Sequence, residues 1–377
     1  MKIALISTGL GRVLRGFESF TESLFQALRH RASEVDVTLF QGGGQAGEQR
    51  DIVPNLHRAD VPSRWFGPDT ASLLEKRSFA LALYPRLRTG GYDVVHYNEL
   101  TMGSALFHLR RRLGGQFKLL YCNGAPSPPI HFHHRCDFTQ VLTGPDYAAA
   151  REFGIADSRL FPIPYGIDAD TFSPARRTSH NFTRDELGVP RDALMVLSVA
   201  AVKREHKRID HLIEETARLG PHVWLVVAGQ RTDDTPGLEQ LAEQRMPGRW
   251  RFVSWPHARV AELYGAADLF VLCSLTEAFG LVTVEAMLSE LPVIVHDGPV
   301  FQWLAQGTAA HVIDMASPGA LSHALGEVFA AGAASGLHSA LRRTREVARQ
   351  RFSWESLMPQ YLEMYHQVSN PKPHRGV

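Results

Sequence analysis

"TEAFGLVTVEAM", residues 276–287, restricts the possible folds of this 377-residue chain more than any other stretch. It places two acids, Glu277 and Glu285, in a run that is otherwise fit for burial. The apolar segment "DLFVLCS" (268–274) precedes it, which predicts a buried strand, then a loop "LTEAFG", then a helix "LVTVEAMLSE". We therefore expect both carboxylates, and the backbone N–H groups around Gly280, to lie at the end of a strand.

The chemistry of these groups indicates the kind of ligand. A helix N-terminus that follows a glycine suits an anion such as phosphate. An ionised carboxylate can accept hydrogen bonds from two sugar or ribose hydroxyls. The alternative is that Glu277 complements the helix dipole and that Glu285 is solvated, but this leaves unexplained why an acid lies within "LVTVEAML". We therefore favour a binding site.

The composition is typical of a globular protein with two domains, because 377 residues exceed what one hydrophobic core usually holds. The net charge of +1 argues against a nucleic-acid binder, which needs a strongly basic domain. The three cysteines have no metal-ligand spacing and indicate free thiols in a reducing compartment. No cleavage site follows the N-terminal apolar run and no stretch is long enough to span a bilayer, so we expect a cytoplasmic protein.

Short apolar runs recur between amphipathic segments and predict parallel strands covered by helices. The runs are residues 2–8, 35–41, 92–98, 117–123, 138–144, 160–166, 194–202, 223–229, 250–255, 268–274 and 291–297. Polar residues 168–193 interrupt the series and indicate an interdomain connection. We expect an α/β protein with two doubly wound domains, 1–175 and 176–351, that face a cleft at the strand ends. An amphipathic helix and tail, 352–377, follow.

Glu277 and Glu285, eight positions apart, resemble the E-x7-E signature of retaining glycosyltransferases with the GT-B fold, in particular family GT4, glycosyltransferase group 1. "IPYGIDADTFSP" (163–174), "LYGAADLFVLCSLTEAFGLVTVEAML" (263–288) and "RFSWESL" (351–357) resemble further segments of that family, in its order. The resemblance covers nearly the whole chain. It implies two Rossmann-like domains, the second of which binds a nucleotide sugar, and a C-terminal helix that crosses back to pack on the first.

The resemblance also implies an activity. The protein would be a retaining hexosyltransferase that moves a sugar from a nucleotide-diphospho-sugar, a UDP-sugar by default or GDP-mannose, to an unidentified hydroxyl. The acceptor would be a glycan, a lipid or a small molecule, with peripheral membrane contact left open, as is the oligomeric state. No cofactor and no metal would be needed. The alternatives are a GT-B sugar phosphorylase or nucleotide-sugar epimerase, and a non-catalytic nucleotide-sugar-binding protein.

The family's roles transfer to the opening stretch residue by residue. Glu277 would bind hydroxyls of the transferred sugar and act in catalysis, and Glu285 would bind the ribose of the nucleotide. Phe279, Gly280 and Leu281 would complete this part of the donor site around the helix start.

A basic loop, "AAVKREHKRID", follows a predicted strand and would hold the donor diphosphate. The family uses an Arg and a Lys here, but Ala201 stands at the Arg position and one extra residue precedes the Lys. Lys207 matches the family Lys and is a catalytic candidate. Lys203 is the better substitute for the Arg and Arg204 its rival, whereas Arg208 is expected to be solvated.

The first domain supplies further candidates at its predicted strand ends. Gly16 would allow a loop to approach the donor phosphates, and Asn123 replaces a His that contacts the sugar in many relatives, so it is a catalytic candidate. His96, Asn98 and Glu99 are candidates for binding the acceptor, although a buried imidazole is an equally good interpretation of His96.

Two stretches superficially suggest metal ligands. "HFHHRCD" (131–137) fits no tetrahedral zinc pattern, and "DAD" (168–170) lies in the segment that matches the family's interdomain region, so no metal site is expected. Phe301 and Trp303 would either stack on a substrate ring or pack within the domain.

Overall fold

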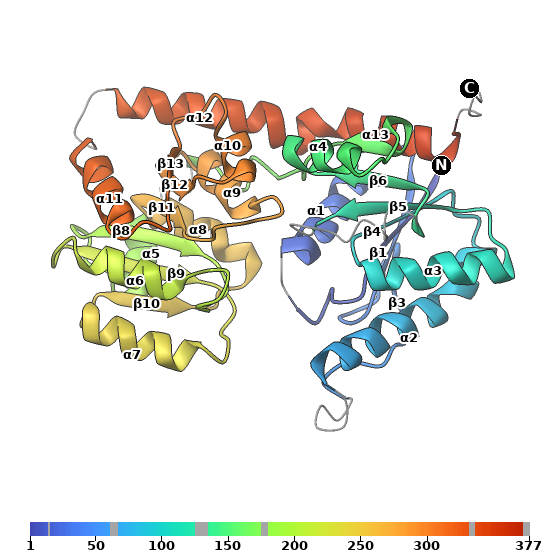
Figure 1. The fold of residues 1–377 in the computed structure, drawn as a ribbon, viewed down its shortest axis with the longest axis horizontal. Coiled ribbons are helices and arrows are strands. Elements are labelled where there is room, and N and C mark those ends of the chain that lie inside the picture. The colour runs from blue at the N-terminus through green and yellow to red at the C-terminus, as the bar shows by residue number, and fades with distance from the viewer. Residues whose placement is uncertain (14–15, 61–66, 125–134, 175–179, 332–335, 372–377) are drawn as a thin grey trace. The chain divides into compact units, whose positions relative to one another are not determined.

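The computed structural model describes residues 1–13, 16–60, 67–124, 135–174, 180–331 and 336–371. The chain forms two compact units, one of Met1–Gly166 with Trp354–Val377 (unit 1) and one of Ile167–Ser353 (unit 2). Each unit is built on its own parallel sheet, with helices against both faces (Figure 1). The described part of the chain contains no helix that is both long and apolar enough to cross a membrane.

Unit 1 contains a seven-stranded sheet in the order β3-β2-β1-β4-β5-β6-β7. Its strands are β1 Lys2–Ser7, β2 Asp36–Gln41, β3 Arg50–Ile52, β4 Val94–Tyr97, β5 Lys118–Asn123, β6 Phe138–Val141 and β7 Leu160–Pro162. Its helices are α1 Gly16–Arg31, α2 Pro68–Thr89, α3 Leu100–Leu113, α4 Gly144–Glu152 and α13 Trp354–Ser369. The central strands are buried on both sides, as continuous apolar runs predict.

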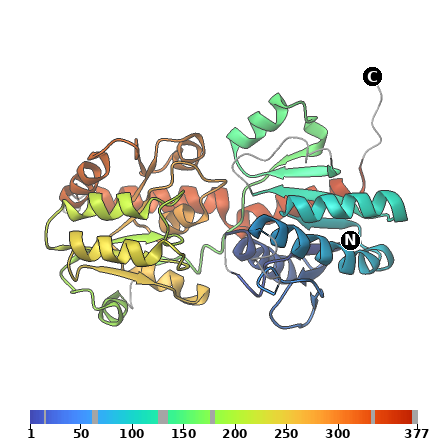
Figure 2. The ribbon, with the colours of Figure 1, turned by 60° about the horizontal axis from the view of Figure 1, so that its bottom comes forward.

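Unit 2 contains a six-stranded sheet in the order β10-β9-β8-β11-β12-β13. Its strands are β8 Leu194–Val199, β9 Val223–Ala228, β10 Trp250–Val253, β11 Leu269–Leu272, β12 Val293–His296 and β13 His311–Ile313. Its helices are α5 His180–Leu187, α6 Ile209–Ala217, α7 Thr235–Arg245, α8 Val260–Ala266, α9 Leu281–Leu288, α10 Pro299–Ala305, α11 Ala320–Ala331 and α12 Leu337–Phe352. Helices α6 and α7 lie side by side over the sheet (Figure 2).

The two sheets have the same plan. In each, the chain starts at a central strand, moves outward through two strands, and returns to the other side of the starting strand. The reversal lies between β1 and β4 in unit 1, and between β8 and β11 in unit 2. Ligands of doubly wound sheets bind beyond the carboxyl ends of the strands at this reversal, so it locates the candidate site in each unit.

The final helix, α13, belongs to unit 1. Trp354 at its start is buried, and its indole N–H donates to the Ser23 hydroxyl of α1 at 2.7 Å. The preceding residues belong to unit 2, where the Ile167 amide donates to the Phe352 carbonyl at 2.8 Å. Residues 167–174, which we expected in the first domain, therefore lie in unit 2, where Phe172 also packs edge-on against Tyr264.

Candidate functional site

The loop between β11 and α9 carries the first of the two glutamates to the carboxyl edge of the unit 2 sheet. Gly280 precedes α9 with φ of 82°, a left-handed conformation that favours glycine. Phe279 is almost completely buried and anchors the loop, with its ring 5.7 Å from that of Phe352 and 6.4 Å from that of Trp303. The side chain of Glu277 thus lies on a loop with a firmly packed base.

Glu277 forms an ion pair with Lys207, which lies between β8 and α6. The two loops meet because their strands are paired in the sheet. The side chains remain 13% exposed for Glu277 and 19% for Lys207, so they are shielded from solvent without being sealed. A preformed pair of opposite charges at the sheet reversal can hold a ligand that has both hydroxyls and anionic oxygens.

Glu285 lies on α9 and is partly buried. The hydroxyl of Tyr264 donates a hydrogen bond to its Oε2 at 2.7 Å. Burial raises the pKa of Glu285 to about 7, while this hydrogen bond acts in the opposite direction by favouring the charged form. The carboxyl group can therefore change its charge near neutral pH.

Tyr264 is a residue that sequence reasoning missed. It lies on α8, is fully buried, and packs against Phe270 of β11 with ring centroids 5.8 Å apart. A buried tyrosine hydroxyl normally needs a hydrogen-bond partner. The sequence predicts that Tyr264, shortly before the buried strand β11, is itself buried. The need of its hydroxyl for a partner could therefore have pointed to Glu285.

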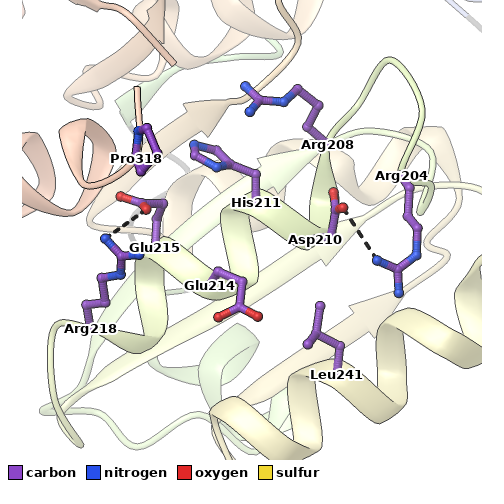
Figure 3. Close-up of a pocket in the computed structure, with 9 residues that line it drawn as sticks. All are labelled: Arg204, Arg208, Asp210, His211, Glu214, Glu215, Arg218, Leu241 and Pro318. Atoms are coloured by element: carbon purple, nitrogen blue, oxygen red, sulfur yellow. Dashed lines mark hydrogen bonds and ion pairs between the residues drawn. The ribbon is translucent and has the colours of Figure 1, made fainter. Parts of the chain in front are cut away.

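Arg204 and Lys203, the two candidates for the second cation, differ in their surroundings. Arg204 is exposed, and its guanidinium lies 3.4 Å from the carboxylate of Asp210. It lines a pocket beside α6 and α7 that neither Lys207 nor Glu277 lines (Figure 3). This placement favours Lys203, which is partly buried, as the second cation beside Lys207.

Arg208 corrects one expectation, since it is not a solvated side chain. Its guanidinium donates to the Met315 carbonyl at 2.6 Å. The contact arises because α6 begins directly after Arg208, beside the loop that follows β13. Arg208 thus ties two segments of unit 2 together.

Two of the three acceptor candidates, His96 and Glu99, form side-chain hydrogen bonds within unit 1. His96 is buried in β4, and its Nδ1 lies 2.8 Å from the Tyr365 hydroxyl of α13. Burial lowers the pKa of His96 to about 3, so the ring is neutral. This placement corresponds to the buried-imidazole interpretation rather than to an acceptor contact.

Glu99 is also buried, directly after β4. It accepts hydrogen bonds from the amide of Thr8, at 2.8 Å, and from the hydroxyl of the same residue. Its oxygens are occupied within unit 1, which argues against the acceptor contact expected from the sequence. Asn98 beside it is partly buried, and Asn123 is buried at the end of β5.

The remaining sequence candidates have simpler positions. Gly16 is the first residue of α1. Phe301 is buried, and Trp303 packs on Phe352 with ring centroids 5.7 Å apart, so packing rather than stacking on a ligand describes both. The carboxylate of Asp168 accepts from the Asp170 amide at 3.1 Å, which makes "DAD" a turn.

The described residues contain no cluster of His, Cys, Asp or Glu that could hold a metal ion. Of the stretch 131–137, residues 131–134 lie outside the described part of the chain. The structure therefore bears only on the remainder of that stretch, in which Cys136 is buried and its Sγ lies 3.4 Å from the Thr139 hydroxyl.

Comparisons with known proteins connect these positions to a family. Residues 179–333 match the family "Glycosyl transferases group 1". D-inositol 3-phosphate glycosyltransferase of Xylanimonas cellulosilytica is 30% identical and aligns over 96% of this chain and 93% of its own length. Alpha-maltose-1-phosphate synthase of Mycolicibacterium smegmatis is 29% identical over 56% of this chain and 57% of its own.

Solved structures share the fold. Sucrose-phosphate synthase of Thermosynechococcus elongatus superimposes with a TM-score of 0.81 and 21% identity, over 97% of this chain and 98% of its own. HepE of Anabaena, solved with UDP and glucose, gives a TM-score of 0.72 and 17% identity, over 97% of this chain and 100% of the HepE chain. The likenesses extend across both units and are not confined to unit 2.

Proposed function

The chain belongs to the group 1 glycosyltransferases and has the GT-B fold, and from this premise we propose that it transfers a hexose from a nucleotide-diphospho-sugar, with retention of anomeric configuration. The observation that carries the proposal is the Lys207–Glu277 pair at the reversal of the unit 2 sheet. Glu285, on the helix that follows the same loop, supplies a second carboxylate.

Each charged group has a role that its chemistry suits. Lys207, with Lys203 beside it in the loop, binds the diphosphate and stabilises the charge that develops on it as the sugar leaves. Glu277 accepts hydrogen bonds from hydroxyls of the transferred sugar, and Glu285 accepts them from the ribose. The ion pair holds Lys207 and Glu277 in place in the free protein, and the donor exchanges it for its own phosphate and hydroxyl contacts.

The donor backbone contacts come from Phe279, Gly280 and Leu281 at the start of α9. In unit 1, Asn123 and Gly16 remain predicted donor contacts that rest on the family resemblance alone. A UDP-sugar is the default donor, supported by HepE, a protein of the same fold that was solved with UDP-glucose. GDP-mannose is the second candidate.

The transfer needs no metal and no cofactor in this proposal, because the cations that neutralise the diphosphate are Lys207 and Lys203. Activity should therefore survive incubation with EDTA, and added magnesium should change the rate by less than about twofold, a change of under about 0.4 kcal/mol in the barrier. Loss of activity on chelation, restored by manganese, would contradict this part of the proposal.

Calorimetry tests nucleotide binding, and product analysis tests the retention of configuration. UDP or GDP should bind, and saturation at a hundred times its Kd should stabilise the protein by about 2.7 kcal/mol. The product of a UDP-glucose reaction with an acceptor should carry an α-linked sugar. An inverted linkage would contradict retention.

The same assay separates the alternatives. Release of a sugar phosphate from inorganic phosphate would identify a phosphorylase, and conversion of the donor without an acceptor would identify an epimerase. Nucleotide binding with no turnover would identify a non-catalytic binder. Among these activities, the charged pair beside an anion-binding helix start supports transfer best, because it offers contacts to both the sugar and the diphosphate.

A further inference from the structure

The loop between β8 and α6, residues 200–208, has a left-handed backbone on both sides of Lys207. His206 has a φ of 67° and Arg208 a φ of 50°, in the region that glycine favours. For residues with long side chains this conformation costs free energy, so the surrounding structure must hold it in place. The contacts of His206 and Arg208 therefore decide where Lys207 lies.

His206 is held by the loop that carries Glu277. Its ring forms a hydrogen bond with the backbone of Thr276, the residue directly before Glu277. The next amide closes the turn, since Lys207 donates to the Glu205 carbonyl at 2.8 Å. The residue before Lys207 is thus attached to the same loop as the ion-pair partner of Lys207.

Arg208, the residue after Lys207, is held by a different segment. Its guanidinium donates to the Met315 carbonyl at 2.6 Å, and its side chain points away from that of Arg204 (Figure 3). Met315 is a firm anchor, because its side chain is completely buried and its amide donates to Nδ1 of His296 at 3.2 Å. His296 is the last residue of β12, so the contact connects Arg208 to the sheet.

The contact with Met315 is what arginine contributes at this position. A glycine would adopt the conformation of residue 208 without strain, so the backbone alone does not require an arginine. The partner is a neutral carbonyl, so the contact neutralises no charge and its effect is geometric. A lysine has a long, flexible side chain, and a fixed backbone beside it limits the positions that its ammonium group can take.

We infer that Arg208 is a positioning residue, which holds the ammonium group of Lys207 against Glu277 in the geometry that receives the donor diphosphate. The inference rests on the proposed function, in which Lys207 stabilises the charge that develops on the leaving diphosphate. Arg208 itself contacts Met315 and acts only through Lys207. It therefore differs from the cations that bind the donor directly.

A double-mutant cycle separates positioning from a general structural role. Arg208→Gly keeps a residue that adopts positive φ freely and removes the guanidinium. We expect it to lower kcat about tenfold, the lower end of what a hydrogen bond to a charged group contributes, and to change KM for the donor by less than about threefold. In the Lys207→Met background the same substitution should lower kcat by less than about twofold, because its effect passes through Lys207.

Arg249→Gly is the matched control. The guanidinium of Arg249 also donates to a backbone carbonyl of unit 2, that of Gly220, at 2.7 Å. Arg249 directly precedes β10, at the amino edge of the sheet and so at the opposite edge from Lys207. This variant should lower the melting temperature and keep kcat within about twofold of wild type.

Three results of the cycle overturn the inference and leave the proposed transferase standing. They are an unchanged kcat in Arg208→Gly, a loss of kcat that persists in full in the Lys207→Met background, and an equal loss of kcat in Arg249→Gly.

A wild type that turns over no nucleotide sugar overturns the proposed function instead, and NMR then decides the positioning role. The chain has six lysines, so isotopic methylation of their amines gives few signals. The signal of Lys207, assigned by its loss in Lys207→Met, responds to the nearby carboxylate of Glu277. In Arg208→Gly it should move toward its position in Glu277→Gln, and Arg249→Gly should leave it in place. A Lys207 signal that is identical in Arg208→Gly and in wild type overturns the inference.

Discussion

The two units place a glutamate at the same point of the same sheet plan and use it differently. Glu99 follows β4 in unit 1, and Glu277 follows β11 in unit 2, each beside the central strand where the strand order reverses. Glu99 binds the backbone amide and hydroxyl of Thr8, beyond β1. Glu277 binds the side chain of Lys207, beyond β8.

The difference shows that position at the sheet reversal does not by itself make a binding site. A buried backbone amide needs its acceptor permanently, so Glu99 cannot leave Thr8 without cost. An ammonium group can exchange a carboxylate for a phosphate, so the partner of Glu277 is replaceable by a ligand. Loop length contributes, because residues 98–99 join β4 directly to α3, whereas residues 273–280 separate β11 from α9.

The largest effect is expected from substitutions that break the Lys207–Glu277 ion pair. Glu277→Gln and Lys207→Met should each lower kcat for transfer at least about a hundredfold, as loss of a preorganised charge stabiliser does. The Kd of free UDP should change little in Glu277→Gln, because its partner is the sugar. Steady-state kinetics measure kcat, and calorimetry measures the Kd. A rate within tenfold of wild type in either variant would contradict the catalytic role of that residue.

The second effect concerns nucleotide binding by Glu285. Glu285→Ala should weaken UDP binding by about 1.5–3 kcal/mol, the size of hydrogen bonds to a charged group. In the wild type, affinity should fall as pH falls from 8 to 6, since protonation near pH 7 removes an acceptor. Tyr264→Phe removes the hydrogen bond that favours the charged form, so it should move this midpoint upward by about one pH unit.

Protonation of Glu285 should stabilise the free protein, although the same protonation weakens UDP binding. Its pKa is raised above the ordinary 4.5, so the folded state holds this proton more tightly than the unfolded state. The resulting stability is fully present below about pH 4.5 and is lost as pH rises through about 7. Glu285→Gln should abolish this part of the dependence, and an identical pH dependence of unfolding in that variant and the wild type would contradict the assigned pKa.

A smaller effect tests the unit 1 side of the comparison. Glu99→Gln should lower the free energy of unfolding by about 1–2 kcal/mol, because neutral hydrogen bonds to Thr8 replace charged ones. The Kd for UDP should stay within about twofold of wild type, a change of about 0.4 kcal/mol. Denaturant titration and calorimetry decide this, and a loss of activity without a loss of stability would return Glu99 to the substrate site.

The smallest effect compares two neighbouring arginines. Arg208→Ala should reduce stability by about 1 kcal/mol, because it leaves the Met315 carbonyl without this donor. Arg204→Ala should change stability by less than about 0.5 kcal/mol, as expected for an exposed ion pair. A reversed ranking in thermal unfolding would show that Arg204 is the more important of the two.

Most of unit 2 could be predicted from the sequence, and less of unit 1. The pair of acids around Gly280 and the basic loop with Lys207 stand next to apolar runs, so their place at strand ends follows from local order. The boundary after Gly166 was missed, because contacts such as that between Phe172 and Tyr264 join residues far apart in the chain.

By itself, the sequence determined the two parallel sheets, the family and the position of Glu277 and Lys207 at one edge of the second sheet. These depend on apolar periodicity and short spacing, which are local properties of the chain. Only the tertiary structure decided which polar groups are already occupied. Glu99 meets Thr8 across 91 positions and His96 meets Tyr365 across 269, and no local pattern reports partners that folding brings from such distances.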